Sequence, residues 1–558
     1  MKAAERSLHQ ATHQVPADAR AAASVLLLRD GAAGPEVLMM RRAERAGDAR
    51  SGAAVFPGGV LDARDRAAHA CCLGGDDAAL SAQLGVAEGG LDYAVAALRE
   101  CFEEVGLLIA DRELDAAAAF PWRDRLQRGE ASALDFCRAF GLRLDVRGLI
   151  YHSHWLTPPG TPKRFDTRFF IARAPAGQQA VADYGEAQEL MWLTPAAALE
   201  PARALKLLPV TQRTLSELAC FDSVDAALAA ARDRCERRQV RLIMPRIGRS
   251  AGGARQVVLP QEWAYAEIGR LDAEGRGDVL AQIVAGRAVR LSPNVVRVTA
   301  PNAGMMTGSG TNSYLVGADD AWAVIDPGPA DAAHLQALLA AAPGRITRIL
   351  VTHTHVDHSP GALALAAATG APLWGRVARY AQGQDSSFVP AHEPAHGERL
   401  MLAPGVTLRV LHTPGHASNH LCYLFEEEKL LFTGDHVMQG STVVINPPDG
   451  DMLAYLNALQ ALQHEDLQWL APGHGFLVGE PQAVLQGLIA HRLQREARVA
   501  DALQRLAPAD IETLLPDVYA DVAPQLHTLA RRSLLAHLLK LRADGRAEVD
   551  QDEIWHAT

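Results

Sequence analysis

The stretch VTHTHVDHSPG, residues 351 to 361, places three histidines and an aspartate within six positions. Later in the chain, HTPGHASNH, LLFTGDHV and LAPGHG each offer a further histidine or aspartate after a strand-like apolar run. Hydrolytic two-metal sites need neutral imidazoles, carboxylates that offset charge, and one ligand shared between the ions. A polar loop without metal is the alternative for any single member, but the order of the whole set favours metal. The candidate ligands are His353, His355, Asp357, His358, His416, Asp435 and His474.

A second group of candidate ligands lies on LRECFEEVGLLI, which begins at residue 98. Glu100, Glu103 and Glu104 are spaced i, i+3 and i+4, so a helix would carry all three on one face. Carboxylates arranged in this way repel one another unless a cation neutralises them, and oxygen ligands suit Mg²⁺. A solvated acidic helix face is the alternative, and the preceding glycine loop FPGG weighs against it.

Alternating strands and helices are expected to position these groups. Strand-like segments such as AASVLLLRD, EVLMMRR and TRFFIAR alternate with Ala-rich helical runs in the first part of the chain, and the alternation resumes near residue 291. A chain of 558 residues exceeds the size of one hydrophobic core, so we expect an α/β and α+β multidomain protein. The predicted divisions are 1–20 as a flexible N-terminus, 21–235 as a first domain, 236–290 as an extension or linker, 291–500 as a second domain, and 501–558 as a helical subdomain.

Composition limits the class of protein. The net charge of −11 argues against binding of nucleic acid through diffuse positive charge. Seven cysteines without regular spacing do not predict a disulfide framework, and a reducing compartment fits them best. The first residues lack a basic segment followed by an apolar one, and no run of about 18 apolar residues occurs. We expect a cytoplasmic protein without a membrane partner, and the sequence predicts no particular oligomeric state.

The HxHxDH motif, TPGH, TGD and the late PGHG together resemble the metallo-β-lactamase superfamily over roughly residues 290 to 500. The resemblance implies an αββα sandwich that binds two Zn²⁺ ions. One zinc would be bound by His353, His355 and His416, the second by Asp357, His358 and His474, with Asp435 as the bridge. Asp357 would also help to position the attacking hydroxide. A bridging aspartate, where many true lactamases have a cysteine at the second zinc, argues against antibiotic hydrolysis.

Further motifs resemble one group within that superfamily. GTNSYLVG, VIDPGP, HTPGHASNH and AHRLQRE look like the beta-lactamase-like protein 2 group, whose members include a zinc endoribonuclease that cuts single-stranded RNA. Glyoxalase-type thioester hydrolysis uses the same seven ligands and is the main rival. The resemblance suggests that Asp326 orients the metal loop. For His420, a role beside the metals or as a donor to the leaving group is as plausible as a plain core or surface position.

The helical tail resembles the small winged-helix-like addition of the same group. Its basic residues offer a way to hold RNA phosphates, although a solvated helix face is the commoner role for such residues. The residues concerned are Arg531, Arg532, Lys540 and Arg542.

RECFEEVGL fits the Nudix signature REUxEExGU, and FPGG matches the glycine loop that precedes it. The chain resembles Nudix hydrolases over roughly residues 20 to 235, which implies an α/β/α sandwich. Glu100, Glu103 and Glu104 would then hold Mg²⁺ or Mn²⁺, with Glu100 and Glu103 as catalytic carboxylates and Arg99 orienting a glutamate. The implied substrate is a small nucleotide-type compound, X linked to a nucleoside diphosphate.

The Nudix-like motif departs from the standard pattern in its spacing. The standard motif puts the glycine 14 positions before the arginine, whereas Gly59 and Arg99 are 40 positions apart, an insertion of 26 residues. A similar insertion occurs in the Nudix group that includes a peroxisomal coenzyme A diphosphatase. PKRFDTRFFIA and LMWLTPAAAL also look like that group. The intervening glutamate of the motif is not identified, with Asp62, Glu88 or neither as its replacement.

The combined motifs predict a bifunctional metal-dependent hydrolase. In this hypothesis the Nudix-like domain cleaves a nucleoside diphosphate-linked compound, and the two-zinc domain acts on single-stranded RNA or on a thioester. The alternative is that the Nudix-like half is a ligand-sensing or scaffold module and only the zinc half, as a glyoxalase-like thioester hydrolase, catalyses.

Overall fold

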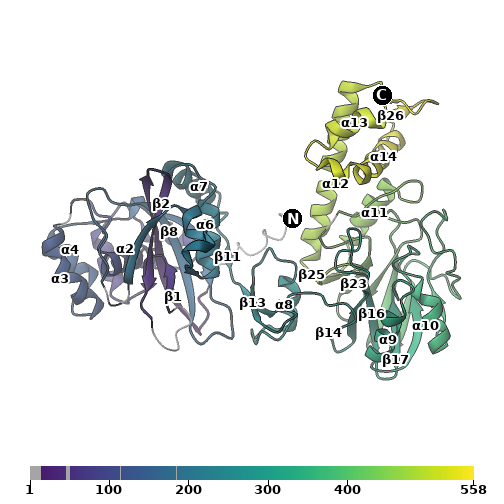
Figure 1. Ribbon diagram of the computed structural model, residues 1–558, viewed down its shortest axis with the longest axis horizontal. Helices are drawn as coiled ribbons and strands as arrows, with labels where there is room; N and C mark the ends of the chain where they lie inside the picture. Colours follow the sequence, from purple (N-terminus) through teal and green to yellow (C-terminus); the bar gives the residue numbers. More distant parts are fainter. Residues whose placement is uncertain (1–13, 45–50, 114, 184, 186, 441) are drawn as a thin grey trace. The chain divides into compact units, whose positions relative to one another are not determined.

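The computed structural model describes residues 14–44, 51–113, 115–183, 185, 187–440 and 442–558 of the chain. Two compact units can be distinguished (Figure 1). Of the described residues, the N-terminal unit contains those from 14 to 247 together with 274–276, and the C-terminal unit contains 248–273 and 277–558. The expected flexible segment at 1–20 falls mostly outside the described residues, and β1 already begins at Ala19.

The N-terminal unit is built on a mixed sheet of nine strands. Its long central strands β1 (Ala19–Gly31) and β8 (Arg164–Arg173) pair in parallel, and β2 (Gly34–Arg42) pairs antiparallel to β1. The apolar runs VLLL and VLMM of β1 and β2 are buried, because helices cover both faces of the sheet. The other strands of the sheet are β3 (Ala53–Val55), β4 (Gly58–Val60), β7 (Ile150–Leu156), β9 (Ala187–Leu193), β10 (Lys206–Leu207) and β11 (Leu242–Ile243).

Helices on the two faces complete the predicted α/β/α sandwich (Figure 1). Helix α2 (Gly90–Val105), which carries the glutamates, packs on β1 and β4, whereas α7 (Val224–Glu236) packs on β7 and β8. The remaining helices of this unit are α1 (Asp77–Leu84), α3 (Ala116–Gln127), α4 (Ala133–Phe140), α5 (Pro195–Leu199) and α6 (Pro209–Leu218).

The 26-residue insertion before Arg99 is folded. It contains the 3₁₀ helix η1 (Asp65–Cys71) except for its first residue, strand β5 (Cys72–Leu73), paired with β6 (Leu144–Asp145), and α1, and it leads directly into α2. Both carboxylate oxygens of Asp77 accept backbone hydrogen bonds at the start of α2, from Gly89 (3.0 Å) and Leu91 (2.9 Å). The insertion thus supports the glutamate-bearing helix from its N-terminal end.

The C-terminal unit contains two six-stranded sheets that pack face to face. Alternation along the strands separates three apolar layers. Tyr314, Ile325, Val410 and Phe432 belong to the layer between the sheets. The outer faces are covered by α9 (Ala332–Ala341) and α10 (Gly361–Thr369) on one side and by α11 (Met452–Leu462) and α12 (Pro481–Leu506) on the other. This is the predicted αββα sandwich.

Both sheets combine antiparallel strands with one or more parallel pairings near one edge. The first sheet has the order β14 (Ala288–Ser292), β15 (Val295–Thr299), β16 (Asn312–Ala318), β17 (Ala321–Ile325), β18 (Ile346–Leu350) and β19 (Leu373–Trp374). The second has the order β20 (Arg399–Ala403), β21 (Val406–His412), β22 (Leu421–Phe425), β23 (Leu430–Gly434), β24 (Trp469–Pro472) and β25 (Val478–Gly479).

Most of the expected extension at 236–290 packs with the C-terminal unit. It forms the hairpin β12 (Arg246–Arg249) and β13 (Arg255–Val258) and the helix α8 (Tyr265–Leu271). Glu267 of α8 forms a buried, two-point ion pair with Arg297 of β15, at 2.6 and 2.9 Å, and accepts a hydrogen bond from the backbone of Leu477. Such pairing compensates the cost of burying both charges and fixes α8 against the sheet.

The C-terminal end is a winged-helix domain. Helices α13 (Ile511–Val518) and α14 (His527–Ala543) pack with the second half of α12 around one apolar cluster. The antiparallel pair β26 (Ala547–Val549) and β27 (Trp555–Ala557) forms the wing. None of the helices in the described part of the chain is long and apolar enough to cross a membrane.

Candidate metal centres

Four strand ends in the C-terminal unit bring the predicted zinc ligands together. The loop that carries HTHVDH follows β18, the loop of His416 follows β21, Asp435 follows β23, and His474 follows β24. The predicted ligands form two groups, and within each group the ligand atoms all lie within 4.8 Å of one another. The first group is His353, His355 and His416, and the second is Asp357, His358, Asp435 and His474. All seven predicted ligands are therefore in the two groups, and the division matches the predicted one.

The imidazoles of the first group present nitrogen atoms to a common point. His416 donates from Nδ1 to the carbonyl of Val444 (2.8 Å), which leaves the lone pair of Nε2 free, and this atom lies 3.0 Å from Nδ1 of His355. Zn–N bonds of about 2.0–2.1 Å in tetrahedral geometry put two ligand nitrogens roughly 3.4 Å apart. The spacing of these two imidazoles is thus close to that of ligands on one ion.

Asp435 lies between the two groups. Its Oδ1 is 3.3 Å from Nε2 of His358 and 3.2 Å from Nε2 of His474, whereas its Oδ2 faces Nε2 of His416 at 3.7 Å. One carboxylate oxygen is therefore directed at each group. This arrangement suits a ligand shared between two ions.

Asp326 fixes the loop that carries HTHVDH through three hydrogen bonds. It accepts hydrogen bonds from the backbone N–H of Thr352 (2.7 Å), the hydroxyl of Thr352 (2.7 Å) and Nδ1 of His358 (2.9 Å). Because the Thr352 hydroxyl gives its proton to Asp326, it accepts from Nδ1 of His353 (3.0 Å). The outward nitrogens of both histidines are thereby fixed toward the ligand groups, which is the usual work of carboxylates behind metal-bound imidazoles. Asp326 thus occupies the orienting position that the resemblance suggested.

Buried polar atoms that lack hydrogen-bond partners in the described part of the chain indicate that these residues could hold a pair of divalent ions. Nε2 of His353, His358 and His474 and Oδ1 of Asp435 are buried without a hydrogen-bond partner among the described residues. Buried polar atoms of this kind are costly unless a partner compensates them. Burial, and then the neighbouring histidines, lower the pKa of His355 to about 3, so it is a neutral ligand at pH 7. Burial lowers the pKa of His474, but the carboxylates of Asp435 and Asp357 outweigh this effect and raise the pKa to about 9.

Two further histidines lie behind the ligands. His420 is fully buried, its Nδ1 is 2.9 Å from the hydroxyl of Thr413, and its ring centre is 5.0 Å from that of His353. His436, next to Asp435, is also buried and lies 5.6 Å from His420, ring centre to ring centre. Neither belongs to a ligand group. His420 is therefore a core residue beside the metal centre in this structure.

In the N-terminal unit, Arg99 gathers the acidic residues. Its Nη1 donates to Glu100 (2.8 Å) and Glu103 (3.2 Å), and its Nε and Nη2 donate to both oxygens of Asp65 (2.8 and 3.1 Å). Asp65 begins η1 and is almost fully buried. Among the described residues, the three glutamates do not form a ligand group of the kind found in the C-terminal unit.

Asp65 is the acidic partner that the sequence left unassigned. Asp62 instead pairs with exposed Arg64, at 2.6 Å, and Glu88 reaches exposed Arg66 at 3.4 Å. The sequence did indicate Asp65, because it lies six positions after Gly59 in the stretch FPGGVLDARD, before the insertion begins.

The glycine loop approaches helix α2 closely. The backbone N–H of Gly58 donates to Glu104 (2.8 Å), and a Cβ atom on Gly59 would lie 2.3 Å from the carboxyl carbon of Glu100. A side chain at Gly59 would displace the Glu100 carboxylate, so the glycine loop and the glutamates of α2 are in direct contact. Burial raises the pKa of Glu103 to about 7, against the opposing effect of Arg99, so its ionised form is costly without further positive charge.

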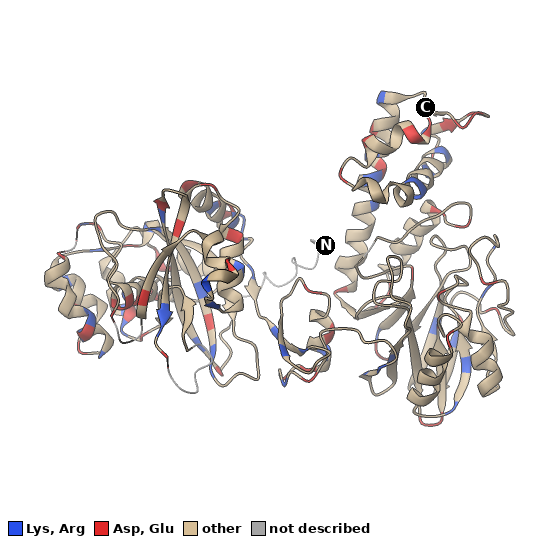
Figure 2. Cartoon of the chain, viewed as in Figure 1, with Lys and Arg blue, Asp and Glu red and all other residues tan. Residues whose placement is uncertain are grey.

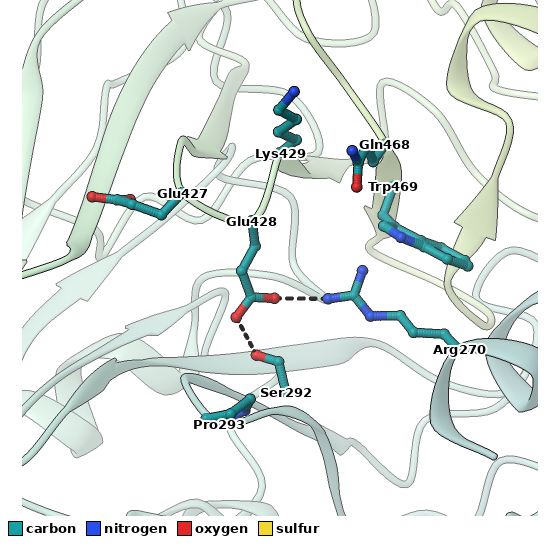
Figure 3. A pocket seen from close by; sticks show the side chains of 8 residues that line it. All are labelled: Arg270, Ser292, Pro293, Glu427, Glu428, Lys429, Gln468 and Trp469. Carbon is teal, nitrogen blue, oxygen red and sulfur yellow. Dashed lines mark hydrogen bonds and ion pairs between the residues drawn. The ribbon is translucent and has the colours of Figure 1, made fainter. Parts of the chain in front are cut away.

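A surface pocket of the C-terminal unit is separate from the candidate metal centre. It has a volume of about 440 Å³ and lies at the N-terminal end of β23, whereas Asp435 follows the other end. Arg270 and Ser292 both reach Glu428, at 2.7 and 2.5 Å (Figure 3), and Lys429 pairs with Asp466 at 2.5 Å. These charges are already compensated. We interpret the pocket as the contact region between α8, β14 and the second sheet, where Arg270 and Ser292 bind Glu428.

Two of the four basic residues of the helical tail, Lys540 and Arg531, are already paired with carboxylates. Lys540 pairs with Glu496 (3.0 Å) and Asp544 (2.6 Å), and Arg531 pairs with Glu512 (2.7 Å). Arg532 and Arg542 are exposed. Figure 2 shows acidic and basic segments mixed over these helices.

Comparisons with known families recognise three regions of the chain. Residues 76–209 match the NUDT19 Nudix domain, residues 306–474 match the metallo-beta-lactamase superfamily, and residues 511–555 match the beta-lactamase associated winged helix domain. The matches fall on the same sandwiches and tail that the structure describes.

Known relatives cover the C-terminal unit. The Beta-lactamase-like protein 2 homolog of Drosophila melanogaster is 29% identical over 47% of this chain and 92% of its own length. Atrochrysone carboxyl ACP thioesterase AgnL7 of Paecilomyces divaricatus is 30% identical over 46% of this chain and 82% of its own length. Among solved structures, a beta-lactamase domain protein from Burkholderia ambifaria is 20% identical with a TM-score of 0.44, covering 50% of this chain and 95% of its own.

Proposed function

The chain belongs to the metallo-beta-lactamase superfamily and also carries a NUDT19-type Nudix domain, and from that premise we propose that it is a metal-dependent hydrolase of two different bonds. In this proposal the C-terminal unit hydrolyses a thioester with two Zn²⁺ ions. The N-terminal unit hydrolyses the pyrophosphate of a nucleoside diphosphate-linked compound with Mg²⁺ or Mn²⁺.

The observation that carries the proposal is the position of Asp435, with one oxygen toward each of two ligand groups. Three imidazoles in one group, and two imidazoles with carboxylates in the other, form a donor set that suits Zn²⁺. When bound, a pair of such ions supplies Lewis acidity and makes water acidic enough to act as a nucleophile at neutral pH.

The residues around the ions would assist the reaction in distinct ways. The fixed imidazoles would hold the two ions in place, and Asp435 would offer one oxygen to each subsite. Asp357 is the most exposed member of the second group, and its Oδ2 lies 3.4 Å from Nε2 of His474. It is the ligand best placed to orient the attacking water and to accept its proton, which the departing thiolate then takes up. The C–S bond breaks as the new C–O bond forms.

A thioester is the substrate class with the best support. The relatives include acyl-carrier-protein thioesterases, and apolar side chains of Met305, Met306 and Val356 are exposed on loops that carry or contact the ligands. Single-stranded RNA lacks comparable support, because Lys540 and Arg531 of the tail are engaged by carboxylates.

The N-terminal unit has two candidate functions. Catalysis is favoured by the joint arrangement of FPGG, Arg99 and the glutamates of α2, in which Glu103 would hold the cation and act as base. Ligand sensing without catalysis is favoured by one observation, that Arg99 already occupies both Glu100 and Glu103. Turnover of any pyrophosphate substrate that is lost in Glu103→Gln would decide for catalysis.

The test of the thioester assignment uses the full-length protein loaded with Zn²⁺. Decanoyl-pantetheine should be hydrolysed, with the free thiol measured colorimetrically, and the activity should be lost with a chelator or with Asp435→Ala. Coenzyme A, NADH, ADP-ribose and capped RNA with Mg²⁺ form the panel for the other unit. RNA cleavage that disappears in His353→Ala, His474→Ala, without any thioesterase activity in the wild type, would overturn the assignment.

A further inference from the structure

The loop at residues 376–384 lies directly against the loops that carry the zinc ligands. The carbonyl of Arg376 accepts a hydrogen bond from Nδ2 of Asn419 (2.8 Å), which also donates to the hydroxyl of Thr354 (2.8 Å). The backbone N–H of Arg379 donates to the hydroxyl of Ser418 at 2.9 Å. The loop is thus fixed through its backbone to residues next to His355 and His416.

The far end of this loop is fixed to the same place. Gln384 forms a β-bridge with His355 and accepts a hydrogen bond from the Thr354 hydroxyl (2.7 Å), and its amide donates to Asp449 (3.1 Å). Asp449 also accepts from the backbone and the hydroxyl of Ser418, at 3.1 and 2.5 Å. The carboxylate that supports the loop is therefore already engaged by three donors.

The two arginine side chains of the loop have no such engagement. Neither guanidinium has a carboxylate partner among the residues that the structure describes, while Arg376 is half-buried and Arg379 is exposed. Their charges act on His412, at the end of the strand that leads to the loop of His416: burial lowers the pKa of this histidine first, and Arg376 and Arg379 add to that effect. The backbone of the loop is held against Asn419 and Ser418, and its two cationic side chains have no carboxylate partner among the described residues.

Exposed apolar side chains lie on the same loop and on the neighbouring ligand loop. Val377 and Tyr380, which alternate with the arginines, are 58% and 45% exposed, and Val356, between two zinc ligands, is 61% exposed. Across the site, the loop of Met305 and Met306 is joined to His474, because the carbonyl of Gly310 accepts from its Nδ1 (3.2 Å). The loops around the ligands therefore carry exposed apolar side chains together with two arginines.

We propose that Arg376 and Arg379 bind the phosphate of a phosphopantetheine-type thioester whose acyl group rests on the neighbouring apolar side chains. This assignment deepens the proposed thioesterase function and rests on it. Arginine is suited to the task, because its planar fork gives charge-assisted, two-point hydrogen bonds to phosphate oxygens. The same phosphate is present in coenzyme A and on acyl carrier proteins, so the chemistry recognised is common to both sources.

The test compares two substrates that differ only by the phosphate, decanoyl-4′-phosphopantetheine and decanoyl-pantetheine. In the full-length, zinc-loaded protein, Arg376→Ala, Arg379→Ala should raise KM for the phosphorylated substrate at least about tenfold. It should leave kcat for both substrates, and KM for decanoyl-pantetheine, within about twofold. A parallel comparison of decanoyl-coenzyme A with decanoyl acyl carrier protein shows which source is the better substrate.

The matched control is Arg345→Ala, Arg348→Ala. These arginines have the same spacing, and one is exposed and the other half-buried, as in the loop. Arg345 precedes β18 and Arg348 lies in its middle, over the ring of Trp374 (5.7 Å), whereas the ligand loop follows the C-terminal end of the strand. The control should change neither KM. If both double variants affect the phosphorylated substrate equally, general charge and not this loop is responsible, and the proposal is overturned.

A binding measurement separates failure of this proposal from failure of the thioesterase assignment. If the wild type hydrolyses neither thioester, the proposed function fails, and the loop is judged by calorimetric binding of S-methyl-4′-phosphopantetheine and S-methyl-pantetheine. The phosphate should strengthen binding in the wild type and not in Arg376→Ala, Arg379→Ala. A phosphate that adds no affinity in the wild type, or adds the same affinity in the variant, would sink the inference.

Discussion

At the scale of single residues, the two centres differ in the charges that they bring together. In the C-terminal unit, orphaned imidazole nitrogens surround the carboxylate of Asp435. In the N-terminal unit, carboxylates surround one arginine, and burial raises the pKa of Glu103 to about 7 despite Arg99. Positive charge from bound cations would compensate both arrangements.

Replacing Asp435 by alanine should reduce the metal content from close to two ions to less than one per chain. The reason is that its two oxygens face different ligand groups, so both ions lose a ligand and their mutual charge is no longer offset. Metal analysis by mass spectrometry after dialysis measures the loss. Asp466→Ala, which removes an exposed carboxylate outside both groups, is the control, and full occupancy in Asp435→Ala would remove the bridging assignment.

Glu103→Gln should stabilise the metal-free protein more at pH 8 than at pH 5. A carboxyl group whose pKa is raised on folding, here from 4.5 to about 7, keeps its proton longer in the folded state. Its contribution to stability is therefore lost as pH rises from about 4.5 through 7, by at most ~3 kcal/mol. Glutamine is neutral throughout. Thermal unfolding in EDTA at both pH values measures the difference.

The control for that experiment is Glu88→Gln, since Glu88 is largely exposed and bears only a surface ion pair with Arg66. Added Mg²⁺ should reverse the ranking and stabilise the wild type more than Glu103→Gln. A variant with the same melting temperature as the wild type at both pH values would contradict the buried, proton-holding state of Glu103.

At the scale of elements, the grouping of the seven candidate ligands and the position of Asp326 behind them could be predicted from the sequence, whereas Asp65 and the attachment of α8 could not. Strand ends followed by HxHxDH, TPGH, TGD and PGHG are local signals, and all seven ligands were assigned from them. Asp65 escaped because the insertion separates it from Arg99 in sequence, although the fold places the two side chains 2.8 Å apart. The attachment of α8 escaped for a similar reason, because the Glu267–Arg297 ion pair joins residues 30 positions apart across a change of element.

Helix α12 contributes to the metal centre although none of its residues is a ligand. Buried Arg492 donates to the carbonyl of Val443, and the adjoining carbonyl of Val444 accepts from His416 (2.8 Å). The guanidinium also lies over the ring of Tyr455, at 5.3 Å, whose hydroxyl donates to the carbonyl of His436 (3.0 Å), next to Asp435. The helix that supports the winged-helix domain thus holds two of the ligands in place.

Arg492→Lys should weaken zinc binding while leaving the fold intact. Lysine keeps the charge but lacks the planar fork that reaches Val443 and covers Tyr455. We expect zinc to dissociate about tenfold faster, measured with a chromogenic chelator, and guanidinium ions should partly restore the rate in Arg492→Ala. Arg498→Lys on the same helix, whose partner is the exposed Asp521, is the control. Equal dissociation rates in all three proteins would show that α12 only supports the tail.

At the scale of the whole chain, the two centres belong to separate compact units, each with its own core and its own ligands. The units therefore need not share residues to function. One class of molecule nevertheless contains both of the proposed bonds, because an acyl-coenzyme A has a thioester at one end and a pyrophosphate linked to a nucleoside at the other. The fusion would then unite two ways of cleaving the same compound.

Decanoyl-coenzyme A should give two product pairs when Zn²⁺ and Mg²⁺ are both present. Cleavage of the thioester releases decanoate and coenzyme A, and cleavage of the pyrophosphate releases decanoyl-4′-phosphopantetheine and adenosine 3′,5′-bisphosphate. Glu103→Gln should abolish only the second pair, and Asp435→Ala only the first, because each residue serves the metal site of one unit. Liquid chromatography with mass spectrometry resolves all four products. Loss of both pairs in either variant would contradict the independence of the two centres, and absence of the bisphosphate in the wild type would favour a sensing role for the Nudix domain.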